Sequence, residues 1–249
     1  MVDEDQFKGW AEYYDYIYSE DGEDVQFYLD EIRQTDKRVL EIGCGTGRIY
    51  LDALENGADI YGFDISEEML EKLREKAGER GLDTKVRQAK MEGFNYDKKF
   101  DLIIIPFNTY MHNLTIEEQV STLENCKEHL KEDGKLIVDF YIPDLEKVAE
   151  GTGEGSRSTE KVEIEGEEYE RVVEVDWESE VEQIRTVKND LYNSHGEVVW
   201  ENEFKTKLVS KREFELLLKL VEFSEWGVYQ GFDREDLEKP VRSVWEVQK

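Results

Sequence analysis

The sequence predicts an α/β fold, a Rossmann-like doubly wound and mostly parallel sheet with an antiparallel β insertion after the fifth strand. Between about residues 36 and 143, short β-branched runs alternate with helical patterns, which is typical of parallel strands joined by crossover helices. A glycine-rich turn follows the first of these runs. Further along, apolar and charged residues alternate with a period of two, which indicates a sheet with one solvated face.

Five runs supply the expected parallel strands. They are "RVLEIG" at 38–43, "ADIYGFD" at 58–64, "KVRQA" at 85–89, "FDLIIIPF" at 100–107 and "GKLIVDFYI" at 134–142. The fourth run is apolar on both faces, as expected of a central strand. The segment "EDG" at 132–134 is expected to turn the chain into the fifth strand.

Capping patterns mark the start of three helices. Ser66 precedes an amphipathic run and can cap it, because a serine oxygen accepts from the free N–H groups of a first helical turn. Thr115 with Glu118, and Ser210 with Glu213, have the spacing of capping boxes.

The segment at 151–209 has a different texture and is expected to form the antiparallel insertion. Residues 1–150 and 210–249 would then form the Rossmann-like domain. The glycine- and serine-rich stretch at 150–159 predicts a flexible link, and "NSHG" at 193–196 predicts a hairpin turn that holds His195.

The composition excludes several classes of function. The net charge of −29 disfavours nucleic acids and anionic membranes as partners, because both are bound largely through Lys and Arg. No apolar run approaches the roughly 20 residues that cross a bilayer, and the first residues lack a secretory pattern. With only Cys44 and Cys126, we expect no disulfide framework and a cytoplasmic location. The acidity is either an adaptation to a salt-rich cytoplasm or simply a soluble surface.

The segment "VLEIGCGTGRI" at 39–49 places Gly43, Gly45 and Gly47 directly behind the first strand. Glycines at the carboxyl end of a strand let a ligand lie against bare backbone, which is where open α/β sheets bind their ligands. The spacing departs from the G-x-G-x-x-G of dinucleotide-binding proteins.

This segment resembles the first motif of the class I S-adenosylmethionine-dependent methyltransferases, and "GFDISEEML" at 62–70 resembles their second. The segment 103–145 is similar to their fourth-to-fifth-strand region, especially in members that act on small molecules. The resemblance covers residues 10–150 well and the remainder loosely. It implies S-adenosylmethionine as the cofactor. The cofactor-binding residues that it implies are Tyr14, Glu41, Gly43, Cys44, Gly45, Gly47, Asp64, Ile65, Met69, Ala89, Met91 and Phe107.

Several of these residues have an expected role under the resemblance. Asp64 would accept both ribose hydroxyl protons, Ile65 would lie on the adenine face, and Glu41 would face the cationic methionyl end. Lys90 stands where the family often has an acid that accepts from the adenine amino group. Backbone groups near Ala89 could replace that contact.

The substrate side is less defined by the sequence. Tyr14 and His112 are the candidate catalytic residues, although a packed or capping role for His112 is the alternative. Tyr18, Asn108 and Tyr141 are candidate substrate contacts. Asp139 either points into the pocket or is a buried polar residue of a core strand. His129 is placed on a surface helix, and the three histidines have no metal-ligand spacing. Trp177, Arg185 and Trp200 are expected to hold two sheets together in preference to lining a substrate lid.

We therefore expect an S-adenosylmethionine-dependent methyltransferase that moves a methyl group to the N or O atom of a small molecule, with an amine slightly favoured. The chain would act as a monomer or homodimer. Two alternatives stay open: a cofactor-binding assembly subunit without catalysis, and an NAD(P)-dependent oxidoreductase, which the glycine spacing disfavours.

Overall fold

The parallel part of the main sheet follows the predicted strands. The computed structural model describes residues 7, 9–18, 22–34, 38–144 and 156–249. The parallel strands are β1 (Arg38–Ile42), β2 (Asp59–Asp64), β3 (Val86–Gln88), β4 (Phe100–Ile105) and β5 (Leu130–Tyr141). Three more strands, β10 (Glu225–Gln230), β11 (Glu235–Asp236) and β12 (Arg242–Gln248), complete the order β11-β10-β12-β5-β4-β1-β2-β3. The predicted fold class is confirmed.

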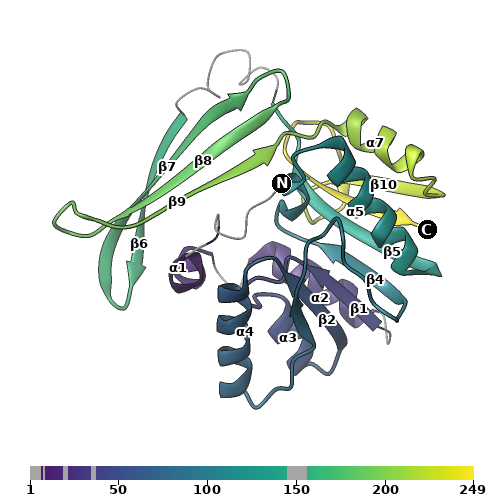
Figure 1. Cartoon of the computed structure of the whole chain (residues 1–249), viewed down its shortest axis with the longest axis horizontal. Coiled ribbons are helices and arrows are strands. Elements are labelled where there is room, and N and C mark those ends of the chain that lie inside the picture. Colours follow the sequence, from purple (N-terminus) through teal and green to yellow (C-terminus); the bar gives the residue numbers. More distant parts are fainter. Residues whose placement is uncertain (1–6, 8, 19–21, 35–37, 145–155) are drawn as a thin grey trace.

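Helices cover both faces of this sheet (Figure 1). The helices α2 (Glu23–Arg33), α3 (Tyr50–Glu55) and α4 (Glu67–Glu79) pack on one face, and α5 (Ile116–His129) and α7 (Lys211–Leu220) pack on the other. β4 lies between them, and all but one of its residues are buried because both of its faces meet helices. The result is a three-layer body with one apolar core on each side of the sheet.

The predicted caps form as the sequence indicates. The Ser66 hydroxyl accepts from the Met69 N–H at 3.4 Å, and the boxes begun by Thr115 and Ser210 are complete in both directions. Two local expectations are corrected. Residues 132–134 lie within β5 and do not form a turn. His129 lies on α5, but its side chain is buried, and its Nε2 accepts from the Tyr96 N–H at 2.9 Å.

A second, four-stranded antiparallel sheet projects from the body (Figure 1). It consists of β6 (Ser156–Ile164), β7 (Glu167–Ser179), β8 (Ile184–Tyr192) and β9 (Val198–Lys207). The predicted link at 150–159 is corrected at its end, because residues 156–159 belong to β6; the rest of it lies outside the described residues. The hairpin turn between β8 and β9 is held by Asn193, whose Oδ1 accepts from the N–H groups of His195 and Glu197, each at 3.0 Å.

The helix α1 (Trp10–Ile17) lies between this second sheet and α4 (Figure 1). Trp10 packs edge-on against Trp200 of β9, with ring centroids 5.0 Å apart. On the other side, Asp15 accepts from the Thr46 hydroxyl at 2.5 Å and from Lys76 Nζ at 2.9 Å. The helix therefore joins the second sheet to the main body.

Gly47 offers a direct test of the packing after β1. Its φ is 93°, and a Cβ there would lie 2.7 Å from Leu51 Cγ and 3.0 Å from Leu73 Cγ. Gly57 has a similar φ of 87° but open space around it, so Gly57→Ala should cost only the conformational penalty, about 1–2 kcal/mol. Gly47→Ala should cost about 1–3 kcal/mol more, because it also overpacks the core. Equilibrium urea unfolding measures both, and equal losses would contradict this packing.

Candidate active site

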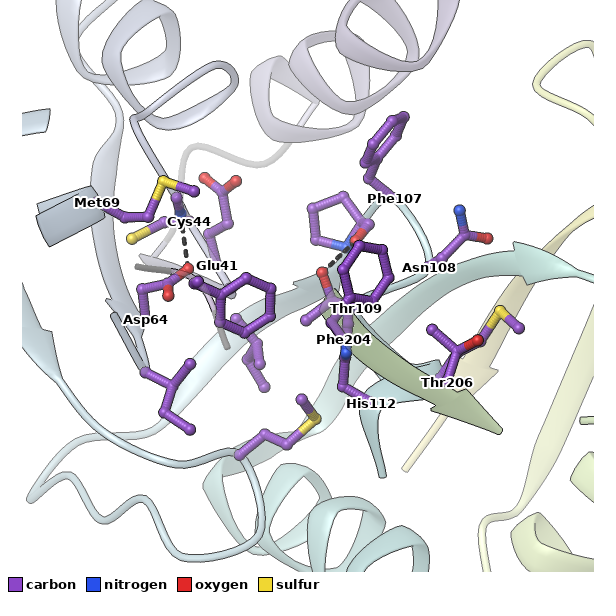
Figure 2. Close-up of a pocket in the computed structure, with 18 of the residues that line it drawn as sticks. Glu41, Cys44, Asp64, Met69, Phe107, Asn108, Thr109, His112, Phe204 and Thr206 are labelled. Carbon is purple, nitrogen blue, oxygen red and sulfur yellow. Dashed lines mark hydrogen bonds between the residues drawn. The ribbon is translucent and has the colours of Figure 1, made fainter. Parts of the chain in front are cut away.

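A cavity of about 300 Å³ opens where β1, β2 and β4 end, beneath α1 and the second sheet. Chain connections leave β1 and β4 toward opposite edges of the sheet, so their ends form the switch point at which open α/β sheets bind ligands. Figure 2 shows the lining side chains, with Glu41, Cys44, Asp64 and Met69 in one group and Phe107, Thr109, His112 and Phe204 in another.

The glycine loop presents bare backbone to this cavity at Gly45. Its φ is 52°, and a Cβ added there would meet nothing within 4 Å. Gly43 also lines the cavity, but a Cβ added there would lie 2.5 Å from Thr109 Cγ2. Gly47 is not among the lining residues, since it packs between α3 and α4. The three glycines therefore meet three different surroundings, and only Gly45 faces open space.

Asp64 ends β2 beside this loop. Its Oδ2 accepts from the Gly45 N–H at 2.9 Å, and its Oδ1 accepts from the Ser66 N–H at 2.9 Å. Burial raises the pKa of this carboxyl, while the backbone N–H groups oppose the shift. An ionised carboxylate has about four lone-pair positions, so both oxygens keep the capacity to accept from a diol.

Glu41, on β1, is a buried acid without a full set of partners. The residue is 2% exposed, and its Oε2 has no hydrogen-bond partner among the described residues. Burial raises the pKa of the carboxyl well above its usual value, and Arg48 only partly opposes this. Arg48 itself is paired with Asp24. A buried, unpaired carboxyl at a cavity wall is costly, and a cationic ligand would remove that cost.

Two tyrosines of the N-terminal region close the cavity above the loop. Tyr14 and Tyr18 have ring centroids 4.8 Å apart, as their spacing on one helical face predicts. Burial raises the pKa of Tyr14, which keeps its hydroxyl protonated. The Tyr18 hydroxyl accepts from Arg171 Nη2 at 3.1 Å, and its ring stands edge-on to Phe107 at 5.0 Å.

The backbone after β4 is strained. Phe107 and Asn108 both have positive φ, at 56° and 63°, which is rare for residues other than glycine. Asp139 holds them there, because its Oδ1 accepts from the Phe107 N–H at 2.8 Å and its carbonyl accepts from the Asn108 N–H at 3.1 Å. Asn108 Oδ1 in turn accepts from the Tyr141 N–H at 3.0 Å.

Asp139 is thus the buried residue of a core strand and is not among the cavity-lining residues. It also accepts from the Tyr28 hydroxyl at 2.6 Å and pairs with Arg242. Of the two roles that the sequence left open for Asp139, the structure shows the buried polar residue and not the pocket residue. Strain of this kind is held by the surrounding structure and is typical of functional sites.

His112 ends the 3₁₀ helix η2 (Thr109–His112) and turns its ring toward the cavity. The rings of Phe7 and Phe204 flank it at centroid distances of 5.3 and 5.5 Å. Its buried Nδ1 accepts no hydrogen bond from, and donates none to, any residue in the described ranges. Burial lowers the pKa of the imidazole to about 4, so the ring is neutral at physiological pH.

All of the site residues predicted from the sequence, except Gly47, line this one cavity. They are Tyr14, Tyr18, Glu41, Gly43, Cys44, Gly45, Asp64, Ile65, Met69, Ala89, Met91, Phe107, Asn108, His112 and Tyr141. One adenine contact proposed from the sequence is already engaged: the Ala89 N–H donates to the Asp64 carbonyl at 3.0 Å.

The second sheet contributes lining residues that the sequence did not single out for the cavity. Arg185 and Val187 of β8, with Phe204 and Thr206 of β9, form part of the wall. For Arg185 this corrects the expectation that it holds two sheets together. The period-two pattern of these strands could have grouped the four residues on one face, but nothing in the sequence says which face covers the cavity.

The other two residues of that group behave as expected of packing residues. Trp177 packs against the apolar core of the main body, and Trp200 is buried against Trp10. None of the helices within the described ranges has the length and apolar character needed to cross a membrane. In the same part of the chain, no group of His, Cys, Asp or Glu is placed to hold a metal ion.

Comparison with known proteins agrees with this geometry. Residues 39–134 match the family model of a methyltransferase domain. The chain is 36% identical over 121 residues to a ubiquinone biosynthesis O-methyltransferase of Actinobacillus pleuropneumoniae, covering 44% of this chain and 50% of that protein. It is 29% identical over 117 residues to the cypemycin N-terminal methyltransferase of a Streptomyces species, covering 47% of each. The chain spans about half the length of the curated relatives it matches.

Solved structures share the fold over nearly the whole chain. The CcbJ methyltransferase of Streptomyces caelestis superposes with a TM-score of 0.81 over 99% of this chain and 98% of its own, at 20% identity. An S-adenosylmethionine-dependent methyltransferase from Clostridium acetobutylicum gives a TM-score of 0.78 over 97% and 98%, at 18% identity.

Residues 39–134 thus match a methyltransferase domain, and nearly the whole chain shares the fold of solved structures from the S-adenosylmethionine-dependent methyltransferase class. S-adenosylmethionine is the cofactor of this class. The residues present fit it, because Gly45 leaves an open cradle and the orphaned acceptor of Glu41 suits a cation. Asp64 keeps free acceptor positions for hydroxyl groups.

Replacing Asp64 tests its predicted contacts with the ribose. Asp64→Ala should weaken binding of S-adenosylhomocysteine by about 2–3 kcal/mol, because two charge-assisted hydrogen bonds are lost. Isothermal titration measures the change, with Asp83→Ala as the control because Asp83 is exposed in a loop. Unchanged affinity in Asp64→Ala would mean that the carboxylate does not bind the cofactor.

The raised pKa of Glu41 predicts that cofactor binding releases a proton. The free protein holds this carboxyl protonated above pH 4.5, and a cation favours the ionised form, so affinity for S-adenosylmethionine should rise with pH above that value. Glu41→Gln should flatten the dependence and reduce proton release. Titrations in buffers of different ionisation enthalpy measure both. Equal proton release by wild type and variant would contradict the assignment.

Proposed function

We propose that this chain transfers a methyl group from S-adenosylmethionine to a nitrogen atom of a small-molecule acceptor. The observation that carries the proposal is that one cavity is lined both by the Gly45 loop with the acids Glu41 and Asp64 and by a second group of polar side chains around His112. The second group includes Asn108 and Tyr141, and it lies under the second sheet. One wall thus suits the cofactor and the other suits an acceptor.

The bound cofactor supplies an electrophilic methyl group on a positively charged sulfur. The protein's task is to align the acceptor with that methyl and to exclude water. Aromatic rings of Trp10, Tyr18 and Phe204 enclose the cavity, and Arg171 fixes Tyr18 to the second sheet. We therefore assign α1 and the second sheet, residues 156–207, the role of a cover over the acceptor.

His112 orients the acceptor through its free Nδ1, which can accept a hydrogen bond from an N–H or O–H group. A pKa of about 4 makes this imidazole a poor base near pH 7, where catalytic bases work best with a pKa close to the operating pH. An alcohol needs such a base to become nucleophilic, whereas a neutral amine already carries a lone pair. This difference favours nitrogen over oxygen as the methyl acceptor.

Turnover of matched compounds tests the proposal. Amines and alcohols of the same carbon skeleton are incubated with S-adenosylmethionine, and the formation of S-adenosylhomocysteine is followed. The amines should be methylated and the matching alcohols should not. Binding of the cofactor without turnover of any acceptor would favour a non-catalytic subunit, and turnover of alcohols alone would refute nitrogen transfer.

The pH profile of the same reaction tests the role of His112. Because the imidazole takes a proton only near pH 4, kcat/KM should show no His112 titration near pH 6.5, and any acidic limb should follow the acceptor amine. His112→Ala should lower kcat/KM about tenfold, the effect of one lost hydrogen bond, with the profile unchanged in shape. His195→Ala, in the exposed turn, is the control. A limb near pH 6.5 that vanishes in His112→Ala would show a catalytic base instead.

A further inference from the structure

Arg185, on β8 of the second sheet, lines the cavity. In the register of β7, β8 and β9 it lies opposite Trp177 on one side and Thr206 on the other. Residues directly opposite each other in antiparallel strands place their side chains on the same face. Arg185 and Thr206 both line the cavity, as do Val187 and Phe204, the next pair along the same face.

The guanidinium of Arg185 has no counter-ion among the residues that the structure describes. Its Nε is buried without a hydrogen-bond partner, and no acid of the described residues forms an ion pair with it. Arg171, on the same face of the sheet, differs in this respect. It pairs with Glu160 at 2.6 Å and donates to Asn189 Oδ1 at 2.6 and 3.1 Å.

Thr206, the residue opposite Arg185 on β9, also carries a polar group that is not hydrogen-bonded within the described residues. This group is its buried hydroxyl, which has no hydrogen-bond partner within the described part of the chain. A half-buried charge and a buried hydroxyl that both lack partners destabilise a fold. The sequence carries 61 acidic residues, yet none of those described neutralises this arginine. Burial lowers the pKa of Arg185, but an arginine stays charged in proteins.

We infer that Arg185 and Thr206 bind an anionic group of the methyl acceptor, a carboxylate or a phosphate. The inference rests on the proposed function, because it places the acceptor in this cavity. A guanidinium binds the oxygens of either anion through paired N–H groups, and a hydroxyl supplies a further donor.

The position of this subsite agrees with the acceptor side of the cavity. Figure 2 shows Phe204 beside His112, with Thr206 farther along the same strand. The ring centroids of Phe204 and His112 are 5.5 Å apart. The anion would therefore be held next to the histidine that orients the acceptor nitrogen, on the side away from Asp64. The acceptor class is a small molecule with both an amine and an anionic group.

Binding of simple anions to Arg185→Met tests the inference. Acetate and inorganic phosphate are titrated at constant ionic strength against the full chain, with and without S-adenosylhomocysteine, and acetamide is the neutral counterpart of acetate. At least one anion should bind the wild type, and Arg185→Met should weaken it about 10- to 100-fold. Arg212→Met removes the same charge from an exposed helix position and should leave anion binding unchanged. Acetamide should not bind.

Thermal stability separates a binding role from a structural one. Arg185→Met removes a half-buried charge that has no ion-pair partner among the described residues, so Tm should stay unchanged or rise by about 2–4 °C. Arg171→Met, which breaks a satisfied network, should lower Tm. Thr206→Val should weaken anion binding without a large change in Tm.

The results that would overturn this inference differ from those that would overturn the proposed function. Equal anion binding by wild type and Arg185→Met, or no anion binding at all, would overturn the inference even if S-adenosylhomocysteine binds. If S-adenosylhomocysteine fails to bind the wild type, the proposed function is wrong, and the anion titration without it still reports on Arg185. Tighter binding of phosphate than of acetate would assign a phosphorylated acceptor, and the reverse order a carboxylate.

Discussion

The hydrogen bond from the Gly45 N–H to Asp64 ties the glycine loop to the end of the neighbouring strand. In this arrangement Gly45 has a positive φ, and Asp64 stands at the last position of β2. It keeps the loop in a shape that presents main chain, without side chains, to the cavity. A side chain at Gly45 would enter this open space without meeting any protein atom. It would therefore interfere with the bound ligand and not with the packing of the protein.

The rest of the site is arranged around that loop by elements far apart in the sequence. Asp15 of α1 binds Thr46 within the loop, which places the aromatic rings of α1 over the cavity. Asp139 of β5 holds Phe107 and Asn108 in a strained backbone on the opposite wall. Unsatisfied polar atoms then remain on both walls, at Glu41 and at His112. A cavity with such atoms is organised for polar ligands, since their partners must come from what binds there.

The sequence was sufficient for the fold because each parallel strand carries a local signal: an apolar run, then a turn, then a capped helix. It also indicated that Gly45 and Asp64 would lie close together, because both are near strand ends. It could not place Arg185 or Thr206, because their contribution depends on how the second sheet folds back over the body. It also misjudged His129, because burial of a polar ring against Tyr96 follows from tertiary packing and not from helical spacing.

A crystal structure of the chain with S-adenosylhomocysteine bound would test the central claim most directly. The account predicts that the ligand lies against the main chain of Gly45, with its amino acid end beside Glu41. Its ribose hydroxyls should lie within hydrogen-bond distance of Asp64. A ligand bound elsewhere, or a ribose turned away from Asp64, would contradict it.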